Sequence, residues 1–152
     1  MYDSIEDIKH NLIKFMSLFH RLFTPAFKCE SKDEYNCTKN QIKAIMLIGR
    51  IKKVTPTVLG KCMDMEKGSI TTLINSMENM ELVYRKDDPK DKRKIWIQLT
   101  KKGEIYYLNQ EKKFLKQIEE LFSTIPEEKI VEFSNSLKSI VDILEEVRDV
   151  NG

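Results

Sequence analysis

The sequence predicts a mostly α-helical chain with one small β-hairpin, an α+β fold, from three features of its 152 residues. Near both ends, apolar side chains recur at steps of three and four, the pattern of long amphipathic helices. In the middle, two short helical stretches follow one another. A highly charged turn then separates two short runs that have the composition of β-strands. Since this length is usual for one domain, we expect a single domain over residues 1–152.

The first predicted element is a long helix within residues 1–28. Ser4 and Asp7 could form a capping box at its start, and Pro25 is expected to kink or end it. The polar segment 27–36 is interpreted as a loop. The apolar stripe of this helix consists of Ile5, Ile8, Leu12, Phe15, Phe19 and Leu22.

Two short helices in tandem are predicted next. Thr55 is expected to cap the first, with Pro56 at its first position, where a missing N–H costs nothing. After a tight connection at 64–66, the second helix runs over about 67–80, with one apolar stripe formed by Ile70, Leu73, Ile74 and Met77. The opposite face carries small, hydrogen-bonding side chains that would let the helix approach base edges closely. This face consists of Lys67, Gly68, Ser69, Thr71, Thr72, Asn75 and Ser76.

A charged hairpin follows the tandem helices. Residues 84–94 hold six Lys or Arg and three Asp, between predicted strands at 82–86 and 95–99. Cations at a hairpin tip can reach phosphates without burying their own charge, although an isolated charge cluster is usually only a solvated turn. Helix, turn, helix and basic hairpin in this order predict a winged helix-turn-helix, with a DNA-binding lobe over residues 38–100.

The charged residues of the hairpin are expected to have different roles. Lys92 and Arg93 are the candidates for the minor groove, where positive side chains read narrow A·T-rich geometry. Asp91 is expected to orient one of them through an ion pair, because a carboxylate facing phosphate would be repelled. The expected anchors to the DNA backbone are Arg85, Lys86 and Lys90.

Several segments resemble the MarR family of bacterial transcriptional regulators: the tandem helices at 59–78, the hairpin at 88–93 with the Leu-Thr-Lys-Lys-Gly run at 99–103, and Thr38-Lys-Asn-Gln41. Two positions depart from the family pattern, since Glu81 replaces a usual glycine and Cys37 a usual leucine. The resemblance implies a sequence-specific regulator of transcription, expected to be a repressor that is released from double-stranded DNA by a small-molecule or redox signal.

The C-terminal half predicts self-association. A helix is expected over about 101–122, and Thr124 with Glu127 could cap another. The latter has an apolar stripe of Ile130, Phe133, Leu137, Ile140, Leu144 and Val147, widened by Val131, Val141 and Ile143. Packing within one chain would account for part of these positions. The width of the stripe favours a homodimer in which 1–28 and 101–152 form the dimerisation region and the two recognition helices read a pseudo-palindrome.

The signal is less well defined by the sequence. The resemblance implies a small aromatic ligand between the DNA-binding lobe and the dimerising helices, and Phe15, Phe19, His20 and Phe23 could line that site. Aromatic residues at this spacing are more often core. The first helix has no cysteine of the kind that some relatives use to sense oxidants. Cys29 and Cys37 could be exposed, whereas Cys62 is expected to be a small buried residue.

Composition and motifs limit the other classes of function. Residues 50–103 carry thirteen Lys or Arg and seven Asp or Glu, whereas residues 126–152 carry three and seven, which favours DNA contact by the middle of the chain. We expect no catalytic residues, cofactor, metal site or membrane span, and a cytoplasmic location, because no corresponding motif or signal peptide is visible. The alternative function is a winged-helix protein-interaction module without specific DNA binding.

Overall fold

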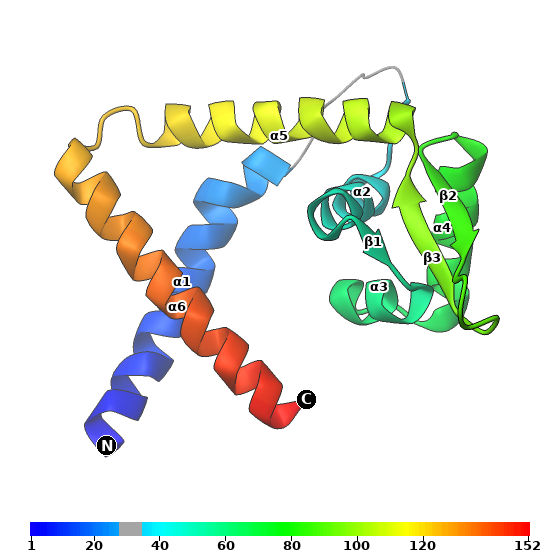
Figure 1. Ribbon diagram of the computed structural model, residues 1–152. Helices are drawn as coiled ribbons and strands as arrows, with labels where there is room; N and C mark the ends of the chain where they lie inside the picture. Colours follow the sequence, from blue (N-terminus) through cyan, green and yellow to red (C-terminus); the bar gives the residue numbers. More distant parts are fainter. Residues whose placement is uncertain (28–34) are drawn as a thin grey trace. The chain divides into compact units, whose positions relative to one another are not determined.

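The computed structural model describes residues 1–27 and 35–152 and divides them into two compact units, Met1–Leu115 and Lys116–Gly152. It confirms the mostly α-helical fold with a small antiparallel sheet (Figure 1). The elements are α1 (Tyr2–Phe27), α2 (Lys39–Ile51), β1 (Lys53–Val54), α3 (Pro56–Met63), α4 (Lys67–Asn79), β2 (Val83–Asp87), β3 (Ile95–Leu99), α5 (Lys101–Leu121) and α6 (Glu127–Asn151).

The sheet has three strands in the order β1-β3-β2, and both pairings are antiparallel. The β2–β3 hairpin was expected, with β2 displaced by one residue from the predicted 82–86. The third strand, β1, was not predicted. It is only two residues long and pairs with β3 through Lys53 opposite Gln98 and Val54 opposite Ile97. This pairing joins the end of α2 to the hairpin.

One hydrophobic core holds α2, α3 and α4 against the sheet. The predicted apolar stripe of α4 is confirmed, because all four of its residues are buried. In Figure 1 the three helices surround the sheet, and the β2–β3 hairpin extends beyond them. The buried hydrophobic residues are Ala44, Ile45, Ile48, Val54, Leu59, Met63, Ile70, Leu73, Ile74, Met77, Leu82, Val83, Ile97, Leu99 and Tyr106.

Local capping signals set the starts of α2 and α3. Thr38 and Gln41 form a reciprocal capping box at α2, which satisfies two backbone N–H groups that a helix start leaves unpaired. Thr55 caps α3, with Pro56 in its first turn, as predicted. Asp64, in the left-handed conformation at φ 51°, then ends α3 and allows the short connection to α4.

The turn from α4 into β2 is made without the glycine that usually stands there. Glu81 adopts a φ of 61°, which is unfavourable for a residue with a Cβ. Neighbouring bonds hold this conformation: the Glu81 N–H donates to Glu78 O at 2.9 Å, and the Thr100 hydroxyl donates to Glu81 O at 2.6 Å. Lys102 Nζ lies 2.7 Å from the Glu81 carboxylate, and this ion pair lowers the pKa of Glu81.

The long helices differ from the prediction at their starts. Because α1 begins at Tyr2, Ser4 lies inside the helix and does not cap it. The predicted box of Thr124 and Glu127 is also wrong, since α6 begins at Glu127 after Pro126 with no side-chain cap. Pro25 lies in the last turn of α1, which ends at Phe27. Most of the loop predicted at 27–36 lies outside the described residues.

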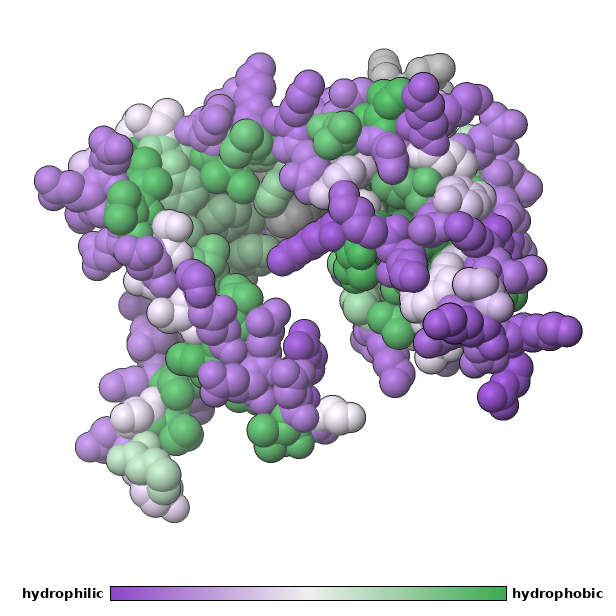
Figure 2. Space-filling view, in the orientation of Figure 1, coloured by the Kyte–Doolittle hydropathy of each residue, from purple (hydrophilic) through white to green (hydrophobic). Residues whose placement is uncertain are grey.

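Both terminal helices expose their apolar stripes. The 25 residues of α6 include none that is buried, and Ile5, Ile8 and Leu12 of α1 are each more than half exposed. In Figure 2 hydrophobic residues lie uncovered along α6, whereas hydrophilic side chains cover the tip of the β2–β3 hairpin. Within the described residues, no helix is long and apolar enough to cross a membrane.

Candidate nucleic-acid interface

The polar face of α4 is exposed from Lys67 to Asn75, whereas Ser76, which was also expected on it, is only partly exposed. Lys67, Gly68 and Ser69 form its first turn, and no atom lies within 4 Å of the position that a Cβ on Gly68 would take. The Thr71 and Thr72 hydroxyls donate to the carbonyls of Lys67 and Gly68, at 2.9 and 3.1 Å. Their methyl groups and oxygen lone pairs therefore remain for contacts outside the chain. This face has the small, accessible surface that close approach to a base edge requires.

A buried hydrogen-bond chain fixes α4 against α2. Gln41 is almost fully buried, and its Nε2 donates to Ser76 Oγ at 3.0 Å. The Ser76 hydroxyl in turn donates to Leu73 O at 2.6 Å. Because Gln41 also completes the capping box of α2, one side chain sets both the start of α2 and the rotation of α4.

Asp88 organises the tip of the β2–β3 hairpin. Its carboxylate accepts hydrogen bonds from Trp96 Nε1 at 2.9 Å and from the backbone N–H groups of Lys90 and Asp91 at 2.8 and 3.0 Å. These donors stabilise the charged form, so they lower the pKa of Asp88, with Trp96 contributing most. The turn is thus held by an aspartate that remains ionised at neutral pH.

Trp96 carries two cations on its ring. Lys53 Nζ, from β1, and Lys94 Nζ lie 4.5 and 5.1 Å from the ring centroid, within the range of cation–π attraction. The indole also donates to Asp88, so this one residue connects the hairpin tip with β1. Neither Trp96 nor Lys53 was predicted to have a role. The signal that could have indicated Trp96 is its position as the only tryptophan of the sequence, next to the basic cluster.

The predicted minor-groove residues extend from this tip. The Arg93 guanidinium lies 3.5 Å from Asp91, with 94% of its side chain exposed. Asp91 also accepts from the Arg93 backbone N–H at 3.0 Å. This is the ion pair expected of Asp91. Lys86, Lys90 and Lys92 are exposed as well.

Arg85 differs from the other basic residues of the hairpin. Only 30% of its side chain is exposed, and its guanidinium pairs with Glu78 and donates to Asn75 Oδ1 at 2.7 Å. Both partners lie on α4, so Arg85 joins β2 to α4. The structure therefore holds this predicted phosphate anchor in a network within the lobe, whereas Lys86 is exposed on the same strand.

The predicted ligand residues on α1 form an aromatic row. The ring centroids of Phe15 and Phe19 are 5.9 Å apart, and those of Phe19 and Phe23 are 5.3 Å apart. His20 is hydrogen-bonded to Thr24 at 3.3 Å. Phe15 and Phe19 are both partly exposed. The row runs along one face of α1 and lines neither of the two cavities described below.

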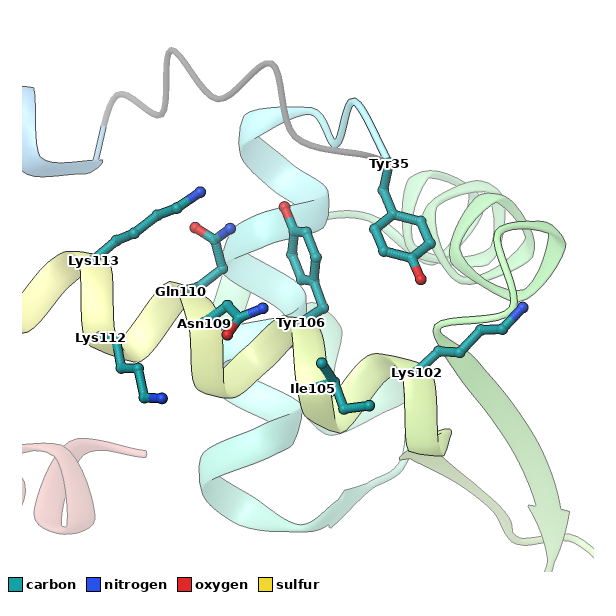
Figure 3. Close-up of a pocket in the computed structure, with 8 residues that line it drawn as sticks. All are labelled: Tyr35, Lys102, Ile105, Tyr106, Asn109, Gln110, Lys112 and Lys113. Atoms are coloured by element: carbon teal, nitrogen blue, oxygen red, sulfur yellow. The ribbon is translucent and has the colours of Figure 1, made fainter.

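A cavity of about 480 Å³ lies beside α5 (Figure 3). Tyr35 and Tyr106 meet edge to face in its wall, with ring centroids 5.5 Å apart. The other lining residues are Lys102, Ile105, Asn109, Gln110, Lys112 and Lys113. Three lysines and two phenols suit a small anion with an apolar body. A smaller cavity of about 310 Å³ lies between α2, α5 and the sheet.

The cysteines and acidic groups that the structure describes form no metal site. Cys37 is half-buried and Cys62 is exposed, which corrects the expected buried position of Cys62. Cys29 lies outside the described residues. Among the residues that the structure describes, no group of three or more His, Cys, Asp or Glu is arranged to hold a metal ion.

Comparison with known proteins agrees with this geometry. Residues 35–94 match the model of the MarR family. The organic hydroperoxide resistance transcriptional regulator of Bacillus subtilis is 30% identical over 71 residues, which cover 47% of this chain and 48% of that protein. The match therefore spans about half the length of this curated relative.

Two solved structures share the fold of nearly the whole chain. A MarR family protein from Bacillus stearothermophilus superposes with a TM-score of 0.74 at 19% identity, covering 95% of this chain and 98% of that one. FabT of Streptococcus pneumoniae, solved in complex with DNA, gives a TM-score of 0.68 at 20% identity, covering 97% and 99%. The lobe over residues 35–94 is therefore similar to the MarR family, and nearly the whole chain shares its fold with a solved MarR family protein.

Proposed function

We propose that this protein is a sequence-specific DNA-binding repressor that acts as a homodimer in the cytoplasm on a pseudo-palindromic operator. The observation that carries the proposal is the pairing, on one lobe, of an exposed small polar helix face with an ordered basic hairpin. The α4 face from Lys67 to Asn75 would enter the major groove. The hairpin, with Arg93 almost fully exposed, would reach the adjacent minor groove or backbone. A relative of the same fold was solved with DNA, which supports this reading.

The homodimer is supported by the exposed apolar faces of the terminal helices. Within proteins, most of the stability of a helix comes from packing its apolar face against other parts of the structure. A helix such as α6, with no buried residue in one copy, would be covered by a second copy. Two-fold symmetry would then place two α4 helices in successive major grooves, roughly 34–36 Å apart.

A small-molecule signal is supported by the cavity beside α5. Lys112 and Lys113 could attract a carboxylate, and the edge-to-face pair of Tyr35 and Tyr106 could pack on its apolar body. The row of Phe15, Phe19, His20 and Phe23 remains a second candidate surface. A ligand that preferred one spacing of the two lobes would shift the population towards it. Coupling of about 1–3 kcal/mol would weaken operator binding roughly 5–150-fold.

An oxidant is the other candidate signal. The Bacillus subtilis relative is named for organic hydroperoxide resistance, but α1 of this chain contains no cysteine. A redox response would therefore have to use Cys29, Cys37 or Cys62, of which Cys62 is exposed. Peroxide treatment of the DNA complex, compared between the native protein and Cys62→Ser, tests this branch.

Affinity measured against salt tests the proposed function. Operators selected from random duplexes should bind at least 10³-fold more tightly than unrelated DNA at physiological salt. The logarithm of the binding constant should fall linearly with that of the salt concentration, because each neutralised phosphate releases counterions. Equal weak binding to all duplexes, or no binding, would instead favour a winged-helix protein-interaction module.

The signal is tested on the same complex. Small aromatic carboxylates are titrated into it, with Lys113→Ala as the variant for the cavity beside α5 and Phe19→Ala as the variant for the α1 row. Release that only Lys113→Ala weakens would support the cavity. Release that only Phe19→Ala weakens would support the row on α1. No release by any compound would contradict a ligand of this class.

A further inference from the structure

The guanidinium of Arg85 lies between two side chains of the recognition helix. Its Nη1 pairs with Glu78 Oε1, and its Nη2 donates to Asn75 Oδ1 at 2.7 Å. Arg85 is on β2, ten residues after Asn75 and seven after Glu78, so the contact exists only in the folded lobe. The Glu78 carboxylate holds the charged end of Arg85 in one place, and the bond to Asn75 is therefore a charge-assisted hydrogen bond with a fixed donor.

This contact determines how the Asn75 amide is turned. Every guanidinium nitrogen is a donor and none is an acceptor, so the atom of Asn75 that faces Arg85 must be the carbonyl oxygen. The amide NH₂ group then points away from Arg85. Asn75 is exposed on the polar face of α4, in line with Lys67, Thr71 and Thr72. The side chain thus offers two N–H donors at the surface, while its acceptor is engaged by a cation.

Guanine and adenine present different hydrogen-bonding groups to such a side chain in the major groove. Guanine presents two acceptors in the major groove, N7 and O6, whereas adenine presents N7 beside an N6 amino donor. An asparagine that reads adenine with both of its atoms needs its carbonyl oxygen to accept from N6. In this chain one lone pair of that oxygen already accepts from the Arg85 guanidinium, and the positive charge beside it disfavours a second donor such as N6. The donors of the amide match guanine and meet a competing donor on adenine.

We propose that Arg85 is a positioning residue that orients the Asn75 amide, so that Asn75 selects guanine over adenine at one position of each half-site. The proposal rests on the proposed DNA-binding function and deepens it, since it assigns a base class to one residue of the α4 face. It also replaces the role of phosphate anchor for Arg85. Lys86, the next residue of β2, is exposed and keeps that anchoring role.

The test measures the base preference of each variant. Single guanine-to-adenine changes are made at every position of the selected operator and titrated with the native protein, Asn75→Ala, Arg85→Lys and Lys86→Ala. For the native protein, a guanine-to-adenine change at one position of each half-site should weaken binding by about 5- to 150-fold. Asn75→Ala should abolish this penalty. Arg85→Lys keeps the charge but cannot hold both partners, so it should reduce the penalty there and leave the salt slope unchanged.

Matched variants separate positioning from anchoring. Lys86→Ala should weaken binding to all duplexes alike and reduce the salt slope by about one. Asn75→Asp keeps an oxygen for Arg85 but replaces the NH₂ donors, so it should lose the guanine preference. This variant tests the orientation of Asn75 even if Arg85→Lys folds poorly. Thermal melts of each variant report folding independently.

Three outcomes would overturn the inference in distinguishable ways. A native protein that prefers adenine at the position sensitive to Asn75→Ala would show that the amide is turned the other way. An Arg85→Lys variant that loses affinity equally for all duplexes, with a changed salt slope, would make Arg85 an anchor. A native protein without any sequence preference would refute the proposed function, and this inference with it.

Discussion

A single methyl group at Gly103 should destabilise the fold by about 1–3 kcal/mol, although alanine is the better helix former. Gly103 lies in the first turn of α5, where a Cβ would come 2.0 Å from Leu82 O and 3.0 Å from Leu82 C. The Leu82 carbonyl cannot easily move, because it accepts from the Thr100 N–H at 3.0 Å. The start of α5 must therefore shift away from β2. The helix propensity gained, about 1 kcal/mol, offsets only part of this cost.

Gly68 is the matched control for Gly103→Ala, because no atom lies within 4 Å of its added Cβ. Gly68→Ala should stabilise α4 by up to about 1 kcal/mol through helix propensity alone. Both variants are unfolded in urea at one protein concentration, since the proposed dimerisation would make apparent stability depend on concentration. The urea midpoint of unfolding should rise for Gly68→Ala and fall for Gly103→Ala. A Gly103→Ala protein as stable as the native one would refute the close approach of α5 to Leu82.

Three further predictions concern the hairpin and the dimer. Arg93→Ala should weaken operator binding by about 1–3 kcal/mol and relax the base preference at the flanks of the site, with an unchanged circular dichroism spectrum. Unchanged affinity and selectivity in a titration would show that the hairpin does not read DNA. Leu137→Asp should disrupt the proposed dimer, because an unpaired carboxylate buried in an apolar interface costs several kcal/mol. Sedimentation should then show monomer or unfolded chain. A stable dimer with full DNA affinity would place the interface elsewhere. The lowered pKa of Asp88 means that its contribution to hairpin order is complete above the ordinary aspartate pKa of about 4 and is lost as the pH falls through the lowered pKa. Fluorescence of Trp96, the only tryptophan, should report that loss, and Asp88→Asn should remove the dependence; an identical acid response in Asp88→Asn would assign the change to other groups.

The features predictable from the sequence are those whose signals are local. The stripe of α4 and the cap of α3 at Thr55 follow from spacings of a few residues, and the structure has them as expected. The Ser-x-x-Asp pattern at Ser4 failed for a related reason. A capping box forms only when its serine is the residue just before the first turn of the helix, and α1 already begins at Tyr2. A capping motif therefore predicts a start only where nothing upstream continues the helix.

The features that could not be predicted depend on contacts between distant residues. No local pattern distinguishes Arg85 from Lys86. They differ because the Arg85 side chain contacts Glu78 and Asn75 on α4, which are distant in the sequence. The strand β1 has only two residues, and its pairing with β3 is made across more than forty positions of sequence. The local sequence around Asp88 predicts only a turn, but its carboxylate also accepts a hydrogen bond from the indole of Trp96 on the returning strand.

Hydroxyl-radical footprinting on the DNA upstream of the gene, with the stoichiometry of the complex measured by sedimentation, tests the central claim most directly. A two-fold dimer that inserts α4 into successive major grooves should protect two symmetric half-sites centred about 10–10.5 base pairs apart, with two chains per site. The hairpins should add protection outside both half-sites. An unprotected duplex, or a single unsymmetric footprint with one chain bound, would contradict a homodimeric operator-binding regulator.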